Sequence, residues 1–330
     1  MYALVGYGYW GEKILKNLNT HGAKVKYIID SNPKRVELAS HTNPDAIVDT
    51  DDSRMLNDNE VDAVVVILPA SLHYGYVKKC LECGKNVLVE KPFTLTLEEA
   101  KELNNIAIAN GKVLMVDHTY LYSQSMRAVK KRIEERKEKI LHIESIRSNM
   151  GIFRKDANVC WDLMPHDLSI MLYLLGTSPT KVRAFGSCHN GSGVVDCAHA
   201  FLQFGDVSVN VSSSWISPKK IRLMQIITDK EIIEFDDVLQ YNKVTAYKAG
   251  FKEEGGNTIC YNEGMEHLPD DDREPLYYMI GDFINAVSKG VSPLSDASFS
   301  TKVVSILESI DKSINEGKEI KLDSIQVSGV

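Results

Sequence analysis

Residues 2–11 read YALVGYGYWG, a short apolar run followed by the glycine pattern Gly6-x-Gly8-x-x-Gly11. The helical pattern EKILKNL follows at residues 12–18, and Asp30 ends the next apolar run, nineteen residues after Gly11. A glycine-rich turn between a buried strand and a helix, with an acidic residue after the following strand, is typical of dinucleotide-binding sites. The start of the chain is therefore predicted to bind a dinucleotide.

Each glycine has its own physical reason in such a motif. Gly6 permits a tight turn, Gly8 lets the backbone approach a pyrophosphate, and Gly11 lets the helix pack closely on the strand. The amide groups at the helix N-terminus favour phosphate. The cofactor-binding residues predicted from this stretch are Gly6, Gly8, Tyr9, Trp10, Gly11, Asp30 and Ser31.

Asp30 also bears on which cofactor is bound. Its carboxylate can accept hydrogen bonds from the ribose hydroxyls of adenosine, and it would repel a 2′-phosphate. NAD is therefore favoured over NADP. Lys34 and Arg35 follow closely and could offset that repulsion, so NADP stays open as the less favoured cofactor.

The first 118 residues alternate nearly continuous apolar runs with helical patterns. Continuous runs are typical of strands buried on both faces of a parallel sheet, and the alternation predicts a doubly wound α/β domain over residues 1–118. The expected strands are 2–6, 24–30, 45–48, 62–68, 86–90 and 112–117.

The pattern changes after residue 118. Strand candidates become longer and alternate polar with apolar residues, which predicts a largely antiparallel sheet with one freer face. We therefore expect a second, α+β domain over residues 119–330. Within it, residues 252–274 are polar and acidic and predict a loop, and two helices, roughly 274–289 and 298–316, close the chain.

Composition narrows the class of protein. The 330 residues are 44% hydrophobic and 25% charged, with a net charge of −7, which is ordinary for a globular protein and unlike a generic nucleic-acid or anionic-membrane binder. Six cysteines are too few for a disulfide scaffold, and no spacing predicts a metal site. We expect a cytoplasmic protein without a membrane or nucleic-acid partner.

Two further motifs carry candidate chemistry. Glu90-Lys91-Pro92 ends the fifth apolar run, at the sheet edge where this fold binds ligands. In WDLMPHD (161–167), Asp162 and His166 are four residues apart and share a helical face, so Asp162 can orient the imidazole. Because proline is tolerated in a first helical turn, Pro165 predicts that the helix begins there.

Taken together, GYGYWG, Asp30, LPASLH, GKNVLVEKP and WDLMPHDLSIMLYLLG resemble the glucose–fructose oxidoreductase, inositol dehydrogenase and rhizopine catabolism family over nearly the whole chain. The resemblance implies a nicotinamide cofactor, a sugar, cyclitol or nucleotide-sugar substrate, and an oligomer formed through the second domain's sheet. Met164 stands where the family usually has glycine. The resemblance implies that the catalytic residues are Lys91, Asp162 and His166, and that Leu68, Pro69, His73, Glu90, Lys91 and Pro92 lie near the nicotinamide.

Substrate contacts are expected from Tyr122, Asn149 and Arg154, together with His166, although each of the first three could instead be core or loop. The leading interpretation is an NAD(H)-dependent sugar dehydrogenase acting on a nucleotide sugar, assembled as a homodimer or homotetramer. An NADP-linked keto-sugar or cyclitol reductase is the alternative enzyme. A non-catalytic NAD-sensing regulator is the alternative from another class, although a sensor would need none of the three catalytic residues.

Overall fold

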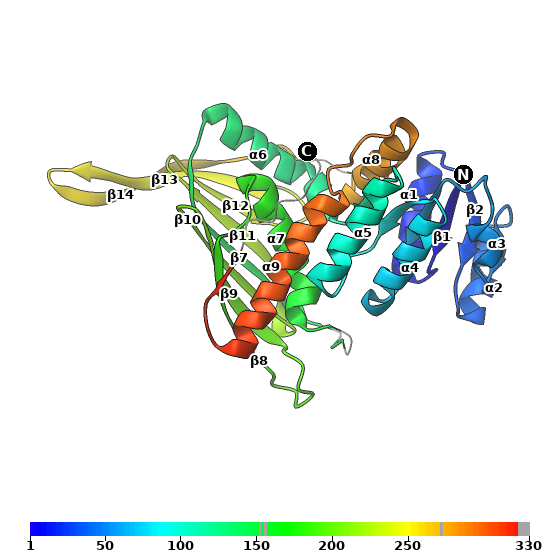
Figure 1. Ribbon diagram of the computed structural model, residues 1–330. Coiled ribbons are helices and arrows are strands. Elements are labelled where there is room, and N and C mark those ends of the chain that lie inside the picture. Colours follow the sequence, from blue (N-terminus) through cyan, green and yellow to red (C-terminus); the bar gives the residue numbers. More distant parts are fainter. Residues whose placement is uncertain (152, 155–156, 271–272, 323–330) are drawn as a thin grey trace. The chain divides into compact units, whose positions relative to one another are not determined.

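A computed structural model describes residues 1–330 except 152, 155–156, 271–272 and 323–330 (Figure 1). The chain forms two compact units. Unit 1 contains Met1–Thr119 and Glu274–Val304, and unit 2 contains Tyr120–Arg273 and the described residues from Ser305 onward. The sequence predicts one uninterrupted second domain over residues 119–330, whereas the structure groups residues 274–304 with unit 1.

The sheet of unit 1 is six-stranded and parallel, in the order β3-β2-β1-β4-β5-β6. This order confirms the doubly wound α/β class and places a topological switch point between β1 and β4. The first three strands are β1 (Tyr2–Val5), β2 (Val25–Ile29) and β3 (Ile47–Asp49), and the others are β4 (Ala63–Val66), β5 (Asn86–Val89) and β6 (Leu114–Val116).

Helices connect these strands. They are α1 (Tyr9–Thr20), α2 (Pro33–Thr42), α3 (Ser53–Leu56), α4 (Ala70–Glu82) and α5 (Leu97–Ala109). After unit 2 the chain returns as α8 (Pro275–Lys289) and the start of α9 (Ala297–Glu316). α8 packs on α1, where the rings of His21 and Tyr277 stack with centroids 4.1 Å apart. This stacking fastens the returning segment to unit 1.

Unit 2 is built on a nine-stranded sheet in the order β14-β13-β12-β11-β7-β10-β9-β8-β15. β7 and β10 pair in parallel, and the other described pairs are antiparallel, which confirms the predicted mostly antiparallel sheet. The strands are β7 (Ile140–Met150), β8 (Lys181–Ser187), β9 (Cys197–Phe204), β10 (Val207–Ser214), β11 (Ile216–Thr228), β12 (Ile232–Asp236), β13 (Val244–Glu254), β14 (Asn257–His267) and β15 (Ile320–Lys321).

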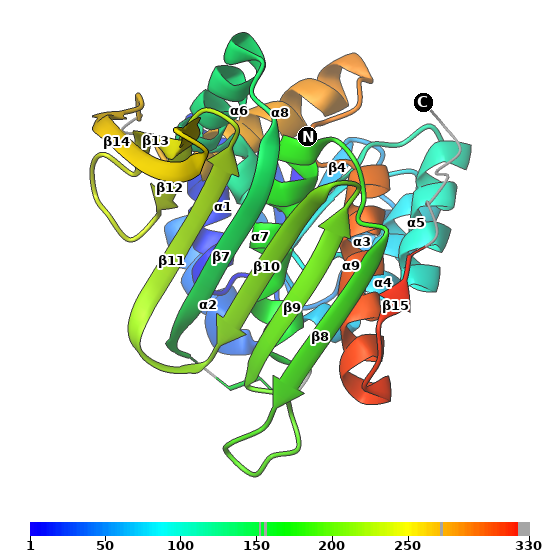
Figure 2. The same cartoon turned by 90° about the vertical axis from the view of Figure 1, so that its left-hand side faces the viewer.

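One face of this sheet is covered and the other is not. α7 (Val159–Leu175) packs across β7, β9 and β10. Among the described helices none lies over the opposite face, which Figure 2 shows toward the viewer. Phe185 and Phe201 point from β8 and β9 to that open face and are about half exposed. The open face therefore presents aromatic surface.

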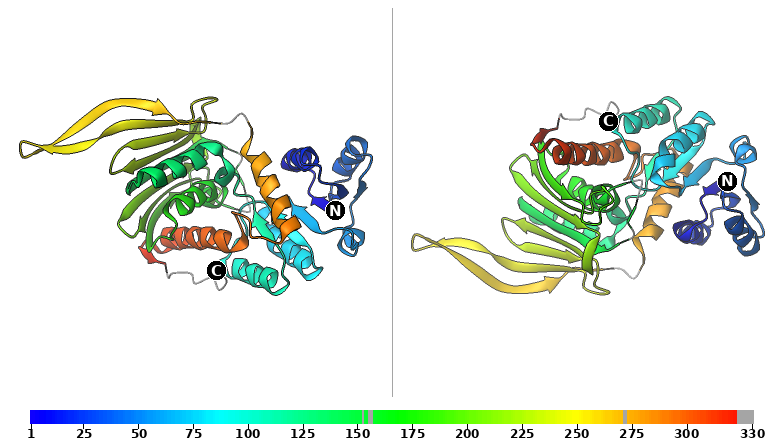
Figure 3. Two further views of the ribbon diagram at one scale, coloured as in Figure 1. Left: turned by 90° about the horizontal axis from the view of Figure 1, so that it is seen from above. Right: turned by 90° about the horizontal axis from the view of Figure 1, so that it is seen from below.

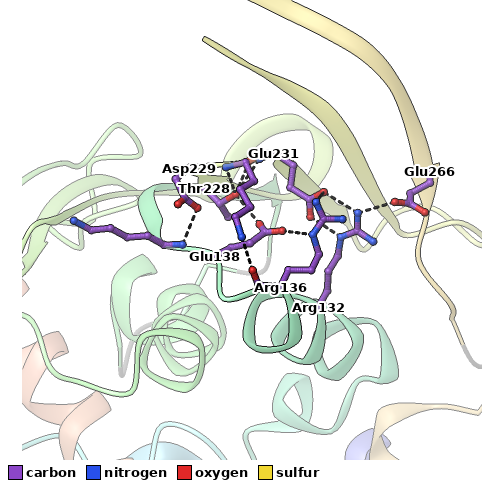
Figure 4. Close-up of polar contacts among 9 residues, drawn as sticks. Arg132, Arg136, Glu138, Thr228, Asp229, Glu231 and Glu266 are labelled. Atoms are coloured by element: carbon purple, nitrogen blue, oxygen red, sulfur yellow. Dashed lines mark hydrogen bonds and ion pairs between the residues drawn. The ribbon is translucent and has the colours of Figure 1, made fainter. Parts of the chain in front are cut away.

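The charged helix α6 (Gln124–Arg136) is fastened to the sheet by ion pairs (Figure 4). Arg132 contacts Glu231 at 2.5 Å and Glu266 at 2.6 Å, and Arg136 contacts Glu138 at 2.6 Å. Glu138 and Glu231 have fully buried side chains, so these pairs hold the helix end against the β11–β12 turn.

The expectation of a loop over residues 252–274 is wrong. β13 and β14 form a long ribbon that extends beyond the rest of the sheet (Figure 3). Its turn contains Gly255 and Gly256, both at positive φ, as a two-residue hairpin turn requires. Both faces of its outer part are exposed, so the strands carry no apolar alternation to reveal them.

Within the described residues, no helix combines the length and the apolar character needed to cross a bilayer.

Candidate functional site

The glycine turn of unit 1 has no room for side chains at two of its positions. A Cβ on Gly6 would lie 2.0 Å from the Ile67 carbonyl oxygen, and one on Gly11 would lie 2.2 Å from the Gly6 carbonyl oxygen. Gly6 also has a φ of +96°, which disfavours other residues. The sequence prediction gave these two glycines turn and packing roles, and the geometry agrees with both.

Gly8 has a different environment. It is the N-cap of α1, and the nearest atoms to a Cβ there would be those of the Arg35 guanidinium, from 3.5 Å. Gly8 is partly exposed, and the Arg35 guanidinium lies beside it, where a pyrophosphate would approach the start of α1. Trp10 donates from its indole nitrogen to Asp117 at 3.2 Å, which ties the start of α1 to the end of β6, while Tyr9 is 76% exposed.

Asp30 is buried and already holds the turn together. Its Oδ2 atom accepts a hydrogen bond from the Tyr7 amide at 2.7 Å, and its Oδ1 atom accepts one from the Asn32 amide at 2.8 Å. Arg35 approaches Oδ2 at 3.5 Å. A carboxylate offers about four acceptor positions, and the two backbone amides use two of them. A ribose hydroxyl would therefore bind the same carboxylate alongside the backbone. The neighbouring Ser31 is exposed.

His73 links two turns at the carboxyl edge of the same sheet. Its Nε2 atom lies 2.8 Å from the Leu68 carbonyl, and its Nδ1 atom lies 2.8 Å from the Pro92 carbonyl. Burial lowers the pKa of His73, so the ring is neutral near pH 7 and donates to one carbonyl at a time. His73 thereby positions the Leu68-Pro69 turn and the Glu90-Lys91-Pro92 turn together.

Lys91 follows β5, and the peptide bond between it and Pro92 is cis. Both Lys91 and Glu90 are partly exposed. The positive charge of Lys91 contributes to lowering the pKa values of His73 and His118, so the lysine lies within electrostatic reach of both imidazoles. His118, which follows β6, is buried.

The helix that carries Asp162 and His166 begins earlier than Pro165 predicted. α7 starts at Val159, with the Asn158 side chain accepting from the Cys160 amide at 2.9 Å, so Pro165 lies inside the helix. Proline there removes the amide that would bond to the Trp161 carbonyl and costs roughly 3 kcal/mol. Twelve of the other sixteen residues of α7 are buried, and this packing offsets the loss.

Asp162 is held by two neighbours in unit 2. Its Oδ2 atom accepts a hydrogen bond from the Trp215 indole at 3.0 Å, and its Oδ1 atom pairs with Arg154 Nε at 2.9 Å. The structure therefore brings together two residues that the sequence assigned to catalysis and to substrate. The orientation of His166 by Asp162 stays a prediction.

Sequence reasoning missed the residues that surround His166. The ring of Tyr120 packs edge to face against the imidazole, with centroids 5.0 Å apart. Arg147 on β7 forms two hydrogen bonds, of 2.9 and 3.0 Å, to Asp167. The sequence does contain a signal for Arg147. It continues the alternation of Ile143 and Ser145, which places it on the buried face of β7. A buried arginine requires an acidic or polar partner, so a partner such as Asp167 is expected.

The other predicted substrate residues are less accessible. Tyr122 is fully buried, with the Arg127 guanidinium 5.5 Å from its ring centroid. Asn149 is partly exposed near the end of β7. Substrate contacts by these two residues stay predictions. The predicted catalytic residues are divided between the two units: Lys91 belongs to unit 1, and Asp162 and His166 belong to unit 2.

Two parts of the chain match models of known protein families. Residues 1–118 match the model of an oxidoreductase family with an NAD-binding Rossmann fold. Residues 145–234 match the GFO/IDH/MocA C-terminal domain.

Known proteins resemble the chain at moderate identity. It is 27% identical to the uncharacterized oxidoreductase YdgJ of Escherichia coli over 61% of each chain. It is 28% identical to scyllo-inositol 2-dehydrogenase (NAD(+)) of Bacillus subtilis over 75% of this chain and 76% of that protein. UDP-N-acetylglucosamine 3-dehydrogenase of Acidithiobacillus ferrooxidans is 28% identical over 69% of this chain and 71% of its own. A solved structure of that enzyme superposes with a TM-score of 0.80 at 24% identity, covering 96% of this chain and 97% of the other.

Proposed function

Because the chain belongs to the GFO/IDH/MocA oxidoreductase family, we propose that it is an NAD(H)-dependent sugar dehydrogenase acting on a nucleotide sugar. The observation that carries the proposal is the glycine turn, in which Gly6 and Gly11 exclude side chains while Gly8, the N-cap of α1, is partly exposed. Bound NAD would supply a hydride acceptor at the nicotinamide.

The proposed cofactor contacts extend from this turn to the carboxyl ends of β4 and β5. The main-chain amides of Gly8, Tyr9 and Trp10 would bind the pyrophosphate, and Asp30 and Ser31 would bind the adenosine ribose. Support for the nicotinamide end comes from His73, which holds the two turns there. The residues proposed at that end are Leu68, Pro69, His73, Glu90, Lys91 and Pro92.

Each catalytic candidate has a proposed role. His166 removes the proton of the substrate hydroxyl during oxidation, and Asp162 orients its imidazole. Lys91 donates a hydrogen bond to the reacting oxygen and stabilises the negative charge that develops there. An alternative keeps the same residues and makes Lys91 the proton carrier. Substrate binding is assigned to Tyr122, Asn149, Arg154 and His166.

A sugar substrate is supported by the relatives, two of which are named for an inositol and for UDP-N-acetylglucosamine. The motifs GYGYWG and WDLMPHD also resemble the forms in family members associated with nucleotide sugars, which supports that substrate class. A specific observation favours a second candidate, an NADP-linked keto-sugar or cyclitol reductase: Arg35 lies beside Gly8 and Asp30, where it could meet a 2′-phosphate. A non-catalytic NAD sensor would have no use for Lys91, Asp162 and His166 together.

A substrate panel tests the proposal. Purified protein is mixed with NAD and with UDP-linked and other nucleotide-linked hexoses, free hexoses and inositols, and nicotinamide absorbance is followed. Reduction of NAD by a nucleotide sugar, with less activity toward the matching free sugar, is the expected result. Activity confined to NADPH and keto sugars would replace the proposal with the second candidate. Nicotinamide binding without turnover on any panel member would favour the sensor.

The assembly is also proposed. We expect a homodimer or homotetramer formed through the open face of the unit 2 sheet, because Phe185 and Phe201 leave apolar surface there. The cytoplasmic location remains a prediction from the sparse cysteines.

A further inference from the structure

The hydroxyl of Tyr120 has every hydrogen-bonding position occupied by protein. It donates to Asp237 Oδ2 at 2.7 Å and accepts from Arg147 Nη1 and from Arg222 Nη1, each at 3.1 Å. A phenol has one donor and two acceptor positions. Tyr120 therefore has no hydrogen-bonding capacity left for a substrate hydroxyl.

The groups that hold this hydroxyl are themselves fixed. Arg147 is buried, with its guanidinium 4.6 Å from the Tyr120 ring centroid, and it pairs with both carboxylate oxygens of Asp167. Asp237 is further paired with Lys243 at 3.1 Å. Buried bidentate pairs of this kind are geometrically rigid. The network thus fixes both the plane and the position of the Tyr120 ring.

That ring is in contact with His166. The two ring planes lie at 64° with centroids 5.0 Å apart, an edge-to-face arrangement. Asp167, the residue next to His166 on α7, is the carboxylate that Arg147 holds. The same network therefore restrains the backbone beside His166 and one side of its imidazole.

We propose that Tyr120 is a positioning residue for His166, fixed by the Arg147, Arg222 and Asp237 contacts, and that it takes no proton from the substrate. This inference rests on the proposed function for the role of His166 in turnover. The charged groups that contact Tyr120 or its partners are Arg147 from β7, Asp167 from α7, Arg222 from β11, and Asp237 and Lys243 from the segment between β12 and β13, while Asp162 lies four residues before His166 on α7.

Tyr120→Phe and Tyr120→Leu separate the ring from the hydroxyl. Phenylalanine keeps the ring and its contact with the Arg147 guanidinium, so turnover should stay within about threefold of the parent, although the network loses hydrogen bonds and the Tm falls. Leucine removes the ring, and turnover should fall roughly 10- to 100-fold because the imidazole is no longer held in place. NADH affinity should be unchanged in both variants.

A second measurement needs no substrate. The imidazole of His166 is titrated by NMR with isotope-labelled histidine, its signal being identified by its loss in His166→Asn. In Tyr120→Leu the midpoint should shift by about half a pH unit, because the imidazole loses its ring contact and its surroundings change. Tyr120→Phe should restore the parent midpoint. Tyr173→Phe is the matched control, because Tyr173 lies on α7 with His166. This variant should change neither the His166 midpoint nor turnover.

Two outcomes would overturn the inference. A merely structural tyrosine predicts that Tyr120→Leu lowers the Tm while turnover per folded molecule and the His166 midpoint stay at parent values. A catalytic hydroxyl predicts that Tyr120→Phe loses turnover as completely as Tyr120→Leu. If the leucine variant does not fold, Tyr120→Met fills the gap with a flexible apolar side chain and carries the same expectation. Should the parent oxidise no sugar, the proposed function fails, and the titration still tests the positioning of His166.

Discussion

Arg35 lies beside Asp30 at the end of β2, with Arg35 Nη1 3.5 Å from Asp30 Oδ2. The same guanidinium nitrogen lies 3.5 Å from the place that a Cβ on Gly8 would occupy. A carboxylate that disfavours a 2′-phosphate and a guanidinium that favours one are therefore adjacent. Cofactor preference depends on the balance between these two groups.

Arg35→Ala should sharpen the preference for NAD. The parent is expected to bind NADH more tightly than NADPH, because the Asp30 carboxylate repels the added phosphate. Loss of the guanidinium should weaken NADPH binding roughly tenfold further and leave NADH binding within about threefold. Fluorescence titration with both reduced cofactors measures this, with the exposed Lys16→Ala on α1 as the control. Equal or tighter NADPH binding by the parent would contradict the preference.

Asp30→Ala should destabilise the protein even without a cofactor. The change removes the acceptor of the buried Tyr7 amide and of the Asn32 amide, which costs about 1–3 kcal/mol for the buried group. Denaturant unfolding of the cofactor-free protein measures it, and Glu37→Ala on α2 is the control. An aspartate that serves the ribose alone would leave the free energy of unfolding unchanged.

Local signals predicted unit 1 well. The continuous apolar runs match the six parallel strands, and the Thr96 side chain caps α5 by accepting from the Glu99 amide at 3.2 Å. These features depend on residues close together in sequence. The glycine motif could be interpreted for the same reason, because its steric demands on Gly6 and Gly11 come from the turn itself.

Features that depend on distant segments were not predictable in this way. Pro165 lies inside α7 because packing of that helix offsets a local cost, and local rules cannot weigh tertiary burial. The β13–β14 ribbon has no covered face to impose alternation. Tyr120 acquires its three hydroxyl partners from β7, β11 and the segment after β12, so its place beside His166 follows only from the sheet order.

His118 should make stability depend on pH. Burial, with a smaller contribution from the charge of Lys91, lowers its pKa to about 3. The unfolded chain binds a proton at this imidazole near pH 6.5, the ordinary value for a free histidine. The stabilisation is therefore complete above about pH 6.5 and is lost as the pH falls toward 3. Relative to His118→Phe, the parent should lose about 2 kcal/mol between pH 7 and pH 5.

Urea unfolding of both proteins at several pH values measures this difference. Neither ring nitrogen of His118 has a hydrogen-bond partner among the described residues, so phenylalanine removes no bond within that part of the chain. The exposed His41 on α2, replaced by glutamine, serves as the control. Parallel pH curves for the parent and His118→Phe would show that the folded protein protonates this imidazole as readily as the unfolded chain.

Phe201→Glu should dissociate the proposed oligomer. Phe201 is half exposed on the open face of the unit 2 sheet, and a buried carboxylate in an interface there would be costly. Light scattering at micromolar concentration should give a dimer or tetramer for the parent and a monomer for the variant. Leu72→Glu, at an equally exposed leucine on α4, should leave the assembly intact. A monomeric parent would contradict the assembly itself.

Lys91→Ala and His166→Ala should each lose turnover while still binding NADH. A positioned proton acceptor contributes about 10²–10⁴-fold to a rate, and a hydrogen-bond donor to a developing oxyanion contributes a similar factor. Asp162→Asn should be milder, because the amide can still accept a hydrogen bond from the Trp215 indole, although it loses the ion pair with Arg154. Single-turnover hydride transfer, NADH titration and Tm on the same three variants provide the measurements.

The competing explanation is that these side chains serve only the fold. It predicts that His166→Ala lowers the Tm and leaves hydride transfer per folded molecule nearly unchanged. Arg154→Ala gives a further distinction, because it removes the ion pair of Asp162 without touching the imidazole. If Arg154 binds substrate, its loss should raise KM more than it lowers kcat. If both Lys91→Ala and His166→Ala keep parental hydride transfer, the active site lies elsewhere in the molecule, even though the family assignment stands.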